Sequence, residues 1–440
     1  MTQAEVLKPS FSFESSLEFA RSMDAKDELR SFRDEFILPR DLGAADGQGC
    51  VYLTGNSLGL QPVKAREYIN AELDDWAKLG VEGHFHARHP WLPYHEFLTD
   101  MSAKVVGALP SEVVVMNTLT VNLHLMMVSF YRPSGKRRKI VIEKGAFPSD
   151  QYAVASQLKL HGASPDEDLL EFTARPGEDT LRLEDMLALL DKHKDEIALV
   201  VLGNVNYLTG QAFDVPALVS KTHAIGAKFG LNLAHGAGNL LLKLHDWQVD
   251  FAVWCSYKYL NAGPGGLAGC FVHEMHGKDF ELPRFAGWWG HNKESRFKMP
   301  DRFDPMPGAE GWQLSNPPIF QLAALRASLE LFERATMVKL RAKGDVLTSY
   351  LEYLLRLINE EVKADSISII TPASPSERGS QLSLRFKGGK SILEMFKAQG
   401  VVCDFREPDI IRATPAPLYN SYEDVYRFAQ IVRGFAAEGK

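Results

Sequence analysis

The stretch VDFAVWCSYKYLNAGPGGLAGCFV, residues 249–272, places a lysine between two apolar runs. The first run ends at Cys255, and Lys258 follows between two tyrosines, ahead of a turn rich in glycine and proline. A lysine held against apolar walls loses hydration, which lowers its pKa. The free amine is then a nucleophile that can form a Schiff base with an aldehyde or ketone. We therefore interpret Lys258 as a candidate catalytic residue, and not as a strand-end lysine that only reaches for water.

Strand-like and helix-like segments alternate over about 200 residues around this lysine. The strand-like runs are EVVVMN (112–117), KIVIE (139–143), IALVVLG (197–203), AKFGLNLAH (227–235) and DFAVWC (250–255). Short β-branched apolar runs are typical of buried parallel strands. The alternation predicts an α/β fold with a large, doubly wound, mostly parallel sheet. We expect this domain to span residues 61–318.

The pattern changes after residue 318. Two long amphipathic helices are predicted over 319–335 and 338–362, followed by short strands and a helix over 391–399. Ser421 and Asp424 have the spacing of a capping box at the start of a last helix. These features predict a small α+β C-terminal domain over residues 319–440. Residues 1–60 are expected to form a helical and looped segment that packs with it, with an amphipathic helix over 24–36.

Composition narrows the class of protein. The chain of 440 residues has a net charge of −7, which argues against nucleic acid as a partner. The basic run at 136–139 is interpreted as a solvated hairpin or strand start. The four scattered cysteines indicate reduced thiols. The N-terminus lacks the pattern of a signal peptide, and no apolar run reaches the ~20 residues needed to span a bilayer. We therefore expect a cytoplasmic protein.

The irregular stretch 79–94 is dense in histidines and aromatic residues. His84, His86 and His89 have a spacing that raises the possibility of a metal site. No carboxylate or cysteine joins them in the sequence, so no metal is predicted. We interpret His86 and His89 as residues of ordinary surface or loop packing.

Polar residues follow several of the predicted strands. Residues 117–120 open a helix after the first strand, residues 146–150 follow the second, and Asn232 and His235 end the fourth. Ligands bind at the carboxyl ends of strands in α/β sheets, and a helix N-terminus suits a phosphate. A phosphate site, a polar group 26 residues before the lysine, and the lysine itself form the arrangement that pyridoxal phosphate needs.

The chain resembles the kynureninase family, whose members are pyridoxal-phosphate enzymes of the aspartate-aminotransferase fold type (fold type I). The matching segments run nearly from end to end and keep the order of the family. They are YLTGNSLGLQP, TLTVNLHLMM, AFPSDQYA, NYLTGQ, LAHGAGN, WCSYKYLNAGPGG, GWWGH, LSNPP and IRATPAPLYNS.

The resemblance implies roles for individual residues. Lys258 would bind the cofactor covalently, and Tyr257 would contact the phosphate and take part in proton transfer. Other residues would hold the cofactor: Leu119 and Thr120 at the phosphate, Phe147 stacked on the ring, Ser149, Asp150, Asn232 and His235 lining the site, and Trp288 and Asn316 lent by the neighbouring subunit. A further set would bind the substrate: Ser57, His84, Asn316 and, at its α-carboxylate, Arg412.

One position departs from the family pattern. Asn232 stands where the family has an aspartate that faces the pyridine nitrogen. A carboxylate keeps that nitrogen protonated, whereas an amide cannot hold the proton by charge. Losing one charged hydrogen bond costs roughly 1.5–3 kcal/mol, which corresponds to about a 10- to 150-fold lower rate. We therefore expect a slower enzyme that still binds the cofactor.

The resemblance also implies the reaction: hydrolytic cleavage of the Cβ–Cγ bond of L-kynurenine or L-3-hydroxykynurenine to an anthranilate and L-alanine. Ser57, His84 and Asn316 match positions that in this family distinguish a 3-hydroxykynurenine pocket from a kynurenine pocket. A histidine and an amide facing the ring can hydrogen-bond a phenol oxygen, so we expect 3-hydroxykynurenine to be the better substrate. A homodimer with shared active sites is implied by the family.

Two alternatives stay open. One is another enzyme of the same fold, a cysteine desulfurase or an aminotransferase. The desulfurase needs a mobile catalytic cysteine, whereas Cys403 lies in an apolar strand. The other is a protein that binds the cofactor without catalysis.

Overall fold

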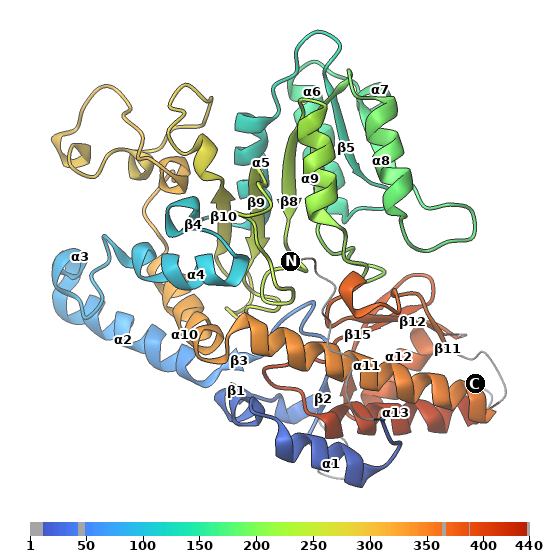
Figure 1. Ribbon diagram of the computed structural model, residues 1–440. Coiled ribbons are helices and arrows are strands. Elements are labelled where there is room, and N and C mark those ends of the chain that lie inside the picture. The colour runs from blue at the N-terminus through green and yellow to red at the C-terminus, as the bar shows by residue number, and fades with distance from the viewer. Residues whose placement is uncertain (1–11, 43–48, 363–366, 387, 438–440) are drawn as a thin grey trace. The chain divides into compact units, whose positions relative to one another are not determined.

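The computed structural model describes residues 12–42, 49–362, 367–386 and 388–437 (Figure 1). The first eleven residues, which carry part of the signal-peptide interpretation, lie outside these ranges. The chain forms two compact units. The small unit combines Met1–Val63, Val205–Ala212 and Arg334–Lys440, and the large unit combines Lys64–Asn204 and Phe213–Glu333.

A seven-stranded sheet forms the centre of the large unit, in the order β4-β10-β9-β8-β7-β5-β6. The five strands from β9 to β6 pair in parallel, and β10 is antiparallel to both of its neighbours. The mostly parallel α/β sheet expected from the sequence is confirmed. The strands are β4 (Val113–Val115), β5 (Lys139–Glu143), β6 (Leu169–Phe172), β7 (Ile197–Gly203), β8 (Lys228–Asn232), β9 (Phe251–Cys255) and β10 (Ala268–Val272).

Helices connect the successive strands from β4 to β8: α5 (Leu119–Phe130), α6 (Pro148–Leu160), α7 (Pro165–Asp168), α8 (Leu183–Lys192) and α9 (Val215–Ala224). The helices α2 (Val63–Leu79), α3 (Gly83–His86) and α4 (Thr99–Val106) precede β4, and α10 (Ile319–Ala335) follows β10. Phe130 of α5 stacks on Phe251 of β9, with ring centroids 5.0 Å apart. The ring of Phe251 also explains a glycine inside β8, because a Cβ at Gly230 would lie 2.0 Å from its Cζ.

A buried carboxylate ties the amino ends of β8 and β9 together. Asp250 is fully buried. It accepts hydrogen bonds from His223 Nε2 at 2.8 Å, His276 Nε2 at 2.7 Å, Lys228 Nζ at 3.0 Å and the Phe229 N–H at 2.8 Å. Burial by itself raises the pKa of Asp250, but the bonds from the two histidines and the lysine charge outweigh it and hold the pKa well below its ordinary value.

The small unit is built on an antiparallel sheet in the order β11-β12-β15-β14. Its strands are β11 (Ile367–Ile369), β12 (Leu382–Phe386), β14 (Asp404–Arg406) and β15 (Ile410–Ala413). Two short pairs join distant parts of the chain: β1 (Phe36–Ile37) with β3 (Gln61–Pro62), and β2 (Val51–Tyr52) with β13 (Val401–Val402). The helices are α1 (Leu17–Lys26), α11 (Met337–Val362), α12 (Lys390–Ala398) and α13 (Tyr422–Ala437).

The segment Val205–Ala212 belongs to the small unit although it lies mid-chain. Thr371 Oγ1 donates to the Thr209 carbonyl at 2.6 Å, and Gln381 Nε2 donates to the Tyr207 carbonyl at 3.0 Å. The segment therefore satisfies polar groups of residues that come more than 150 positions later.

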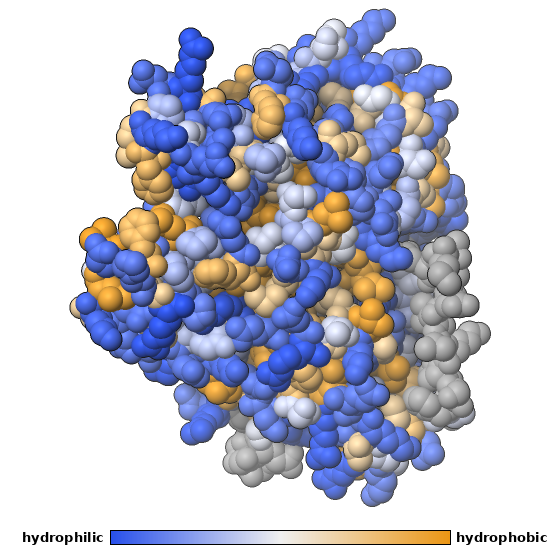
Figure 2. Space-filling model, turned by 60° about the vertical axis from the view of Figure 1, so that its left-hand side comes forward, coloured by the Kyte–Doolittle hydropathy of each residue, from blue (hydrophilic) through white to orange (hydrophobic). Residues whose placement is uncertain are grey.

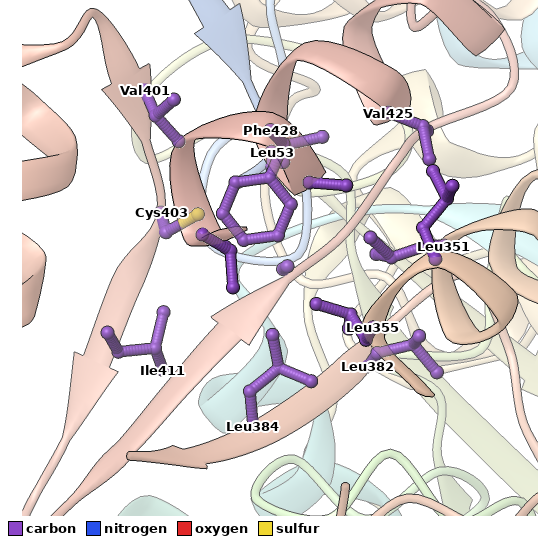
Figure 3. Packing of buried hydrophobic residues seen from close by; sticks show 14 of the residues in the cluster. Leu53, Leu351, Leu355, Leu382, Leu384, Val401, Cys403, Ile411, Val425 and Phe428 are labelled. Atoms are coloured by element: carbon purple, nitrogen blue, oxygen red, sulfur yellow. The ribbon is translucent and has the colours of Figure 1, made fainter. Parts of the chain in front are cut away.

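Apolar side chains from the helices and the sheet form the core of the small unit (Figure 3). The ring of Phe428 lies among side chains of Leu53, Cys403 and Leu384. Burying one such large apolar side chain stabilises the fold by about 1.5–3 kcal/mol. All four cysteines of the chain are buried free thiols.

The N-terminal helix differs from the expectation. The structure has α1 over Leu17–Lys26 and a 3-10 helix over Arg30–Glu35, so the predicted helix over 24–36 is wrong. Ser16 caps α1 by accepting the Phe19 N–H at 3.1 Å. Asp27 ends it, because its side chain accepts the Leu29 N–H at 2.9 Å and closes a turn.

The predicted capping box at the last helix is confirmed. Ser421 Oγ accepts the Asp424 N–H at 3.0 Å, and the Asp424 carboxylate accepts the Ser421 N–H at 3.2 Å. The expected helices over 319–335 and 338–362 correspond to α10 and α11.

The described surface is mixed in polarity. On the face drawn in Figure 2, apolar side chains form separate patches among hydrophilic ones. Within the described ranges, no helix is both long and apolar enough to cross a membrane.

Candidate active site

Lys258 lies just beyond the carboxyl end of β9, whose five residues are all buried. Its Nζ is 3.1 Å from His235 Nε2. The same nitrogen is 5.9 Å from the ring centroid of Phe147 and 6.0 Å from that of Tyr257. The structure therefore brings together four of the side chains that the sequence proposed for this site.

The glycine-rich turn after Lys258 has a conformation that favours glycine. Gly263 has φ +90° and Gly265 has φ +64°, both in the region that L side chains rarely adopt. No described atom lies within 4 Å of a Cβ built at either position. Backbone conformation is thus sufficient to explain these two glycines.

Two helices begin near this lysine and offer their N-termini. The helix α5 starts at Leu119 after the extended residue Thr118, and α6 starts at Pro148. Thr120 Oγ1 and Ser149 Oγ are hydrogen-bonded at 2.8 Å, which ties the first turns of the two helices together. Unpaired N–H groups and the helix dipole make such a place suitable for a phosphate.

Asn232 and Asp150 form a buried pair. Asn232 Nδ2 lies 2.9 and 2.8 Å from the two carboxylate oxygens of Asp150, and Asn232 Oδ1 accepts the Ala234 N–H at 2.9 Å. Burial raises the pKa of the Asp150 carboxyl to about 6, although the Asn232 amide and the charge of Lys258 act in the opposite direction. The amide at 232 therefore has a carboxylate directly behind it.

His235 and Tyr257 flank the lysine with different chemistry. His235 is buried, and its ring meets Tyr259 edge-on at 6.3 Å. Burial raises the pKa of the Tyr257 hydroxyl, and its interaction with the Cys255 thiol adds to the shift. Tyr257 is therefore a neutral hydroxyl at physiological pH.

Trp288 and Asn316 lie close to each other in the large unit. Trp288 Nε1 donates to Asn316 Oδ1 at 2.9 Å. The side chain of Asn316 is exposed, and Trp288 is 41% exposed, so both could still contact another molecule.

The remaining proposed substrate residues belong to both units. Ser57 lies in the small unit at a turn where its N–H donates to the Thr54 carbonyl at 2.9 Å. His84 lies on the short helix α3 of the large unit, with its ring edge-on to Trp91 at 5.4 Å.

Arg412 is almost fully buried on β15 of the small unit, directly opposite Asp404 on β14. Its Nε donates to Asp404 Oδ1 at 2.6 Å, its Nη2 donates to Asp404 Oδ2, and its Nη1 donates to the Tyr207 carbonyl at 2.7 Å. A guanidinium has five N–H groups. One N–H on each Nη therefore remains beyond these bonds, and two N–H groups of a guanidinium can bind a carboxylate in two places.

Asp404 is a residue that the sequence reasoning missed. Its signal was available, because a hairpin turning near residue 408 places position 404 opposite position 412.

The residues of the large unit fit a pyridoxal phosphate. They supply an amine that can bind its aldehyde, two helix N-termini for its phosphate, the face of Phe147 for its ring, and a buried amide with a carboxylate behind it for its ring nitrogen. Together with the sheet, these features define the class of protein: a pyridoxal-phosphate enzyme of fold type I.

Solved structures share this fold. A cysteine desulfurase from Thermococcus onnurineus NA1 aligns with a TM-score of 0.74 at 17% identity, over 93% of this chain and 98% of its own. The cysteine desulfurase CsdA from Escherichia coli aligns with a TM-score of 0.73 at 17% identity, over 93% of this chain and 98% of its own.

Sequence relatives define the family more closely. The kynureninase C-terminal domain model matches residues 340–432. The kynureninase of Myxococcus xanthus (strain DK1622) is 61% identical over 97% of this chain and 99% of its own. That of Koribacter versatilis (strain Ellin345) is 56% identical over 95% of this chain and 97% of its own. The chain belongs to the kynureninase family and is a hydrolase of carbon–carbon bonds.

Proposed function

We propose that this protein uses pyridoxal 5'-phosphate to hydrolyse the Cβ–Cγ bond of L-3-hydroxykynurenine in preference to L-kynurenine, releasing 3-hydroxyanthranilate or anthranilate together with L-alanine. The observation that carries the proposal is the amine of Lys258, 3.1 Å from His235 at the carboxyl end of a buried strand, in a chain of this family. The cofactor supplies an electron sink for the electrons released at the substrate α-carbon.

The cofactor would be held from both ends. Leu119 and Thr120 would bind the phosphate at the start of α5, with Ser149 bonded to Thr120. Phe147 would stack on the ring, while Asp150 and Asn232 would face its nitrogen. His235 would lie beside the ring next to Lys258.

Two residues would move protons. Lys258 would take the proton from the substrate α-carbon once the substrate amine has displaced it. Tyr257 would donate and accept protons as water adds to the side-chain ketone and the carbon–carbon bond breaks, which its raised pKa permits because the hydroxyl keeps its proton. Groups of this kind typically contribute 10²–10⁴-fold to the rate.

Substrate binding would use both polar ends of the amino acid. The remaining N–H pair of Arg412 would bind the α-carboxylate, and Asp404 holds the guanidinium for it. His84, Asn316 and Ser57 would hydrogen-bond the phenol oxygen of 3-hydroxykynurenine. A site built for that hydroxyl penalises a substrate without it, because its polar groups are left unpaired.

Asn232 would make this enzyme slower than one with an aspartate there. The amide gives no negative charge to hold a proton on the ring nitrogen, and the nearest carboxylate is that of Asp150. The cofactor ring would therefore accept electrons less readily.

The assembly would be a cytoplasmic homodimer. Trp288 and Asn316, which are exposed and bonded to each other, would complete the site of the second copy.

The test is to compare kcat/KM of the purified holoprotein for 3-hydroxykynurenine and kynurenine, with both products identified. We expect an anthranilate and alanine in equal amounts and a higher value for the hydroxylated substrate. A strong preference for kynurenine would contradict the specificity, and absence of both products would contradict the activity. A desulfurase is disfavoured by Cys403, which is 6% exposed and whose thiol pKa is raised by burial.

A further inference from the structure

Helix α2 carries two buried carboxylates one turn apart, Glu72 and Asp75, which are 1% and 5% exposed. Asp75 Oδ2 accepts the backbone N–H of Arg88 at 2.9 Å. Glu72 accepts from Trp91 and Tyr94, at 3.0 Å from the indole Nε1 and 3.1 Å from the hydroxyl. The two acidic residues thus hold the irregular stretch after α3 on α2.

The bonds to Glu72 are strong constraints because of its burial. A buried carboxylate is tolerated only when donors satisfy it, and losing a donor leaves a costly unpaired charge. A cation also lies nearby: the Arg326 guanidinium is 5.6 Å from the ring centroid of Tyr94 and 4.1 Å from that of Tyr68. Because its N–H donates to the buried carboxylate of Glu72, the indole of Trp91 is fixed in orientation.

Trp91 in turn contacts the helix that carries His84. The two rings meet edge-on, with centroids 5.4 Å apart and planes at 85°. A Cβ at Gly83 would lie 2.4 Å from Trp91 Cη2, so the indole packs directly on the backbone there. The Leu92 N–H also donates to the His84 carbonyl at 3.3 Å. The ring and the backbone of His84 are both held by this stretch.

We propose that Glu72 and Trp91 are positioning residues that fix the His84 ring and so set the discrimination between 3-hydroxykynurenine and kynurenine. The inference rests on the proposed function, in which His84 meets the phenol oxygen. In this role neither residue needs to touch the substrate. They act by keeping one rotamer of Trp91, which limits the orientations open to the imidazole.

The test uses two conservative substitutions in the holoenzyme. Glu72→Gln keeps the size of the side chain but presents an amide nitrogen to one of its two donors. Trp91→Phe keeps an aromatic ring against His84 but removes the N–H that orients it. For each variant, the ratio of kcat/KM for the hydroxylated over the unhydroxylated substrate should fall roughly threefold to tenfold. The change should come mainly from a higher KM for 3-hydroxykynurenine.

Trp312→Phe is the matched control. It removes a buried indole N–H that donates to Ser129 Oγ at 2.9 Å, in the same unit but on a different helix, α5. It should lower thermal stability to a similar extent and leave the substrate ratio unchanged. Because the ratio is independent of the fraction of active enzyme, partial unfolding of a variant does not move it.

Three outcomes overturn the inference in different ways. If His84→Phe lowers the ratio while Glu72→Gln and Trp91→Phe leave it at the parent value, the positioning role is wrong and the proposed function stands. If the parent does not discriminate and His84→Phe has no effect, the role falls together with the substrate preference, while kynureninase activity stands. If the parent cleaves neither substrate, the proposed function itself fails.

Discussion

Replacing Asn232 with aspartate should change two properties of the protein at once. The new carboxylate would lie where Asn232 Nδ2 now lies, 2.8–2.9 Å from both oxygens of Asp150. Two carboxylates this close in a buried site repel each other when both are ionised, which raises the pKa of the pair. In the cofactor-bound protein, a protonated ring nitrogen would supply the compensating positive charge.

The magnitudes follow from these distances. A charged hydrogen bond to the ring nitrogen is worth roughly 1.5–3 kcal/mol, so turnover of Asn232→Asp should rise about 10- to 150-fold. Without cofactor, two like charges about 4 Å apart repel by roughly 4 kcal/mol at an effective dielectric constant near 20. We therefore expect the cofactor-free variant to be less stable than the parent by about 2–4 kcal/mol at neutral pH.

The sign of the pH dependence is defined. The folded pKa of the pair is raised above that of an unfolded aspartate, so the folded state binds the extra proton. The destabilisation of the variant is absent at pH values below the pKa of the unfolded aspartate. It grows as the pH rises toward the pKa of the folded pair, and in the parent protein the pKa of Asp150 is already about 6. The stability difference between the variant and the parent should therefore shrink as the pH is lowered.

The assays are turnover at saturating cofactor and thermal unfolding of both forms between pH 5 and pH 8. Asn359→Asp on α11 is the control, because its amide donates to the Ile367 carbonyl at 2.7 Å and no carboxylate among the described residues bonds it. It should leave turnover unchanged. Equal turnover of Asn232→Asp and the parent, or equal stability of their cofactor-free forms at every pH, would refute the reasoning.

Three further predictions concern single residues. Borohydride reduction of the holoprotein followed by peptide mapping should label Lys258 alone, and Lys258→Ala should lose both the label and turnover; a label elsewhere would contradict the site. Asp404→Asn should raise KM about tenfold with a smaller change in kcat, because Arg412 loses its charged partner; an unchanged KM would argue against that role. Asp250→Asn should lower the free energy of unfolding by roughly 3–5 kcal/mol at pH 7. Folding lowers the pKa of Asp250, so its carboxylate stabilises the parent at pH values above the pKa of an unfolded aspartate. That contribution is lost as the pH falls through the folded pKa. Acid titration of variant and parent stability checks it, and a difference independent of pH would oppose it.

Long, regular apolar patterns were the easiest part of the fold to predict. The strand KIVIE corresponds to β5 residue for residue, and the helix over 319–335 corresponds to α10. In both, the apolar period alone separates the element from its neighbours. The helix over 24–36 failed because side-chain bonds decide its ends: Asp27 closes a turn onto Leu29.

Contacts between positions far apart in the chain could not be predicted from the sequence. Lys258 was recognisable from its local setting, because the apolar run and the glycine turn adjoin it. The bond between Asn232 and Asp150 joins residues 82 positions apart, and nothing local to either predicts it. The same holds for Glu72 and Trp91, since the irregular stretch after α3 has no periodic pattern to place it on α2.

The small unit is assembled from three separate segments of the chain, and this has a consequence for synthesis on the ribosome. The strand β2 and the segment Val205–Ala212 emerge early, yet β13, Thr371 and Gln381, which complete their hydrogen bonds, are translated near the end. A fragment beginning at residue 319 would lack both earlier pieces and leave those polar groups unsatisfied. The small unit can therefore complete its fold only after Thr371, Gln381 and β13 have been synthesised.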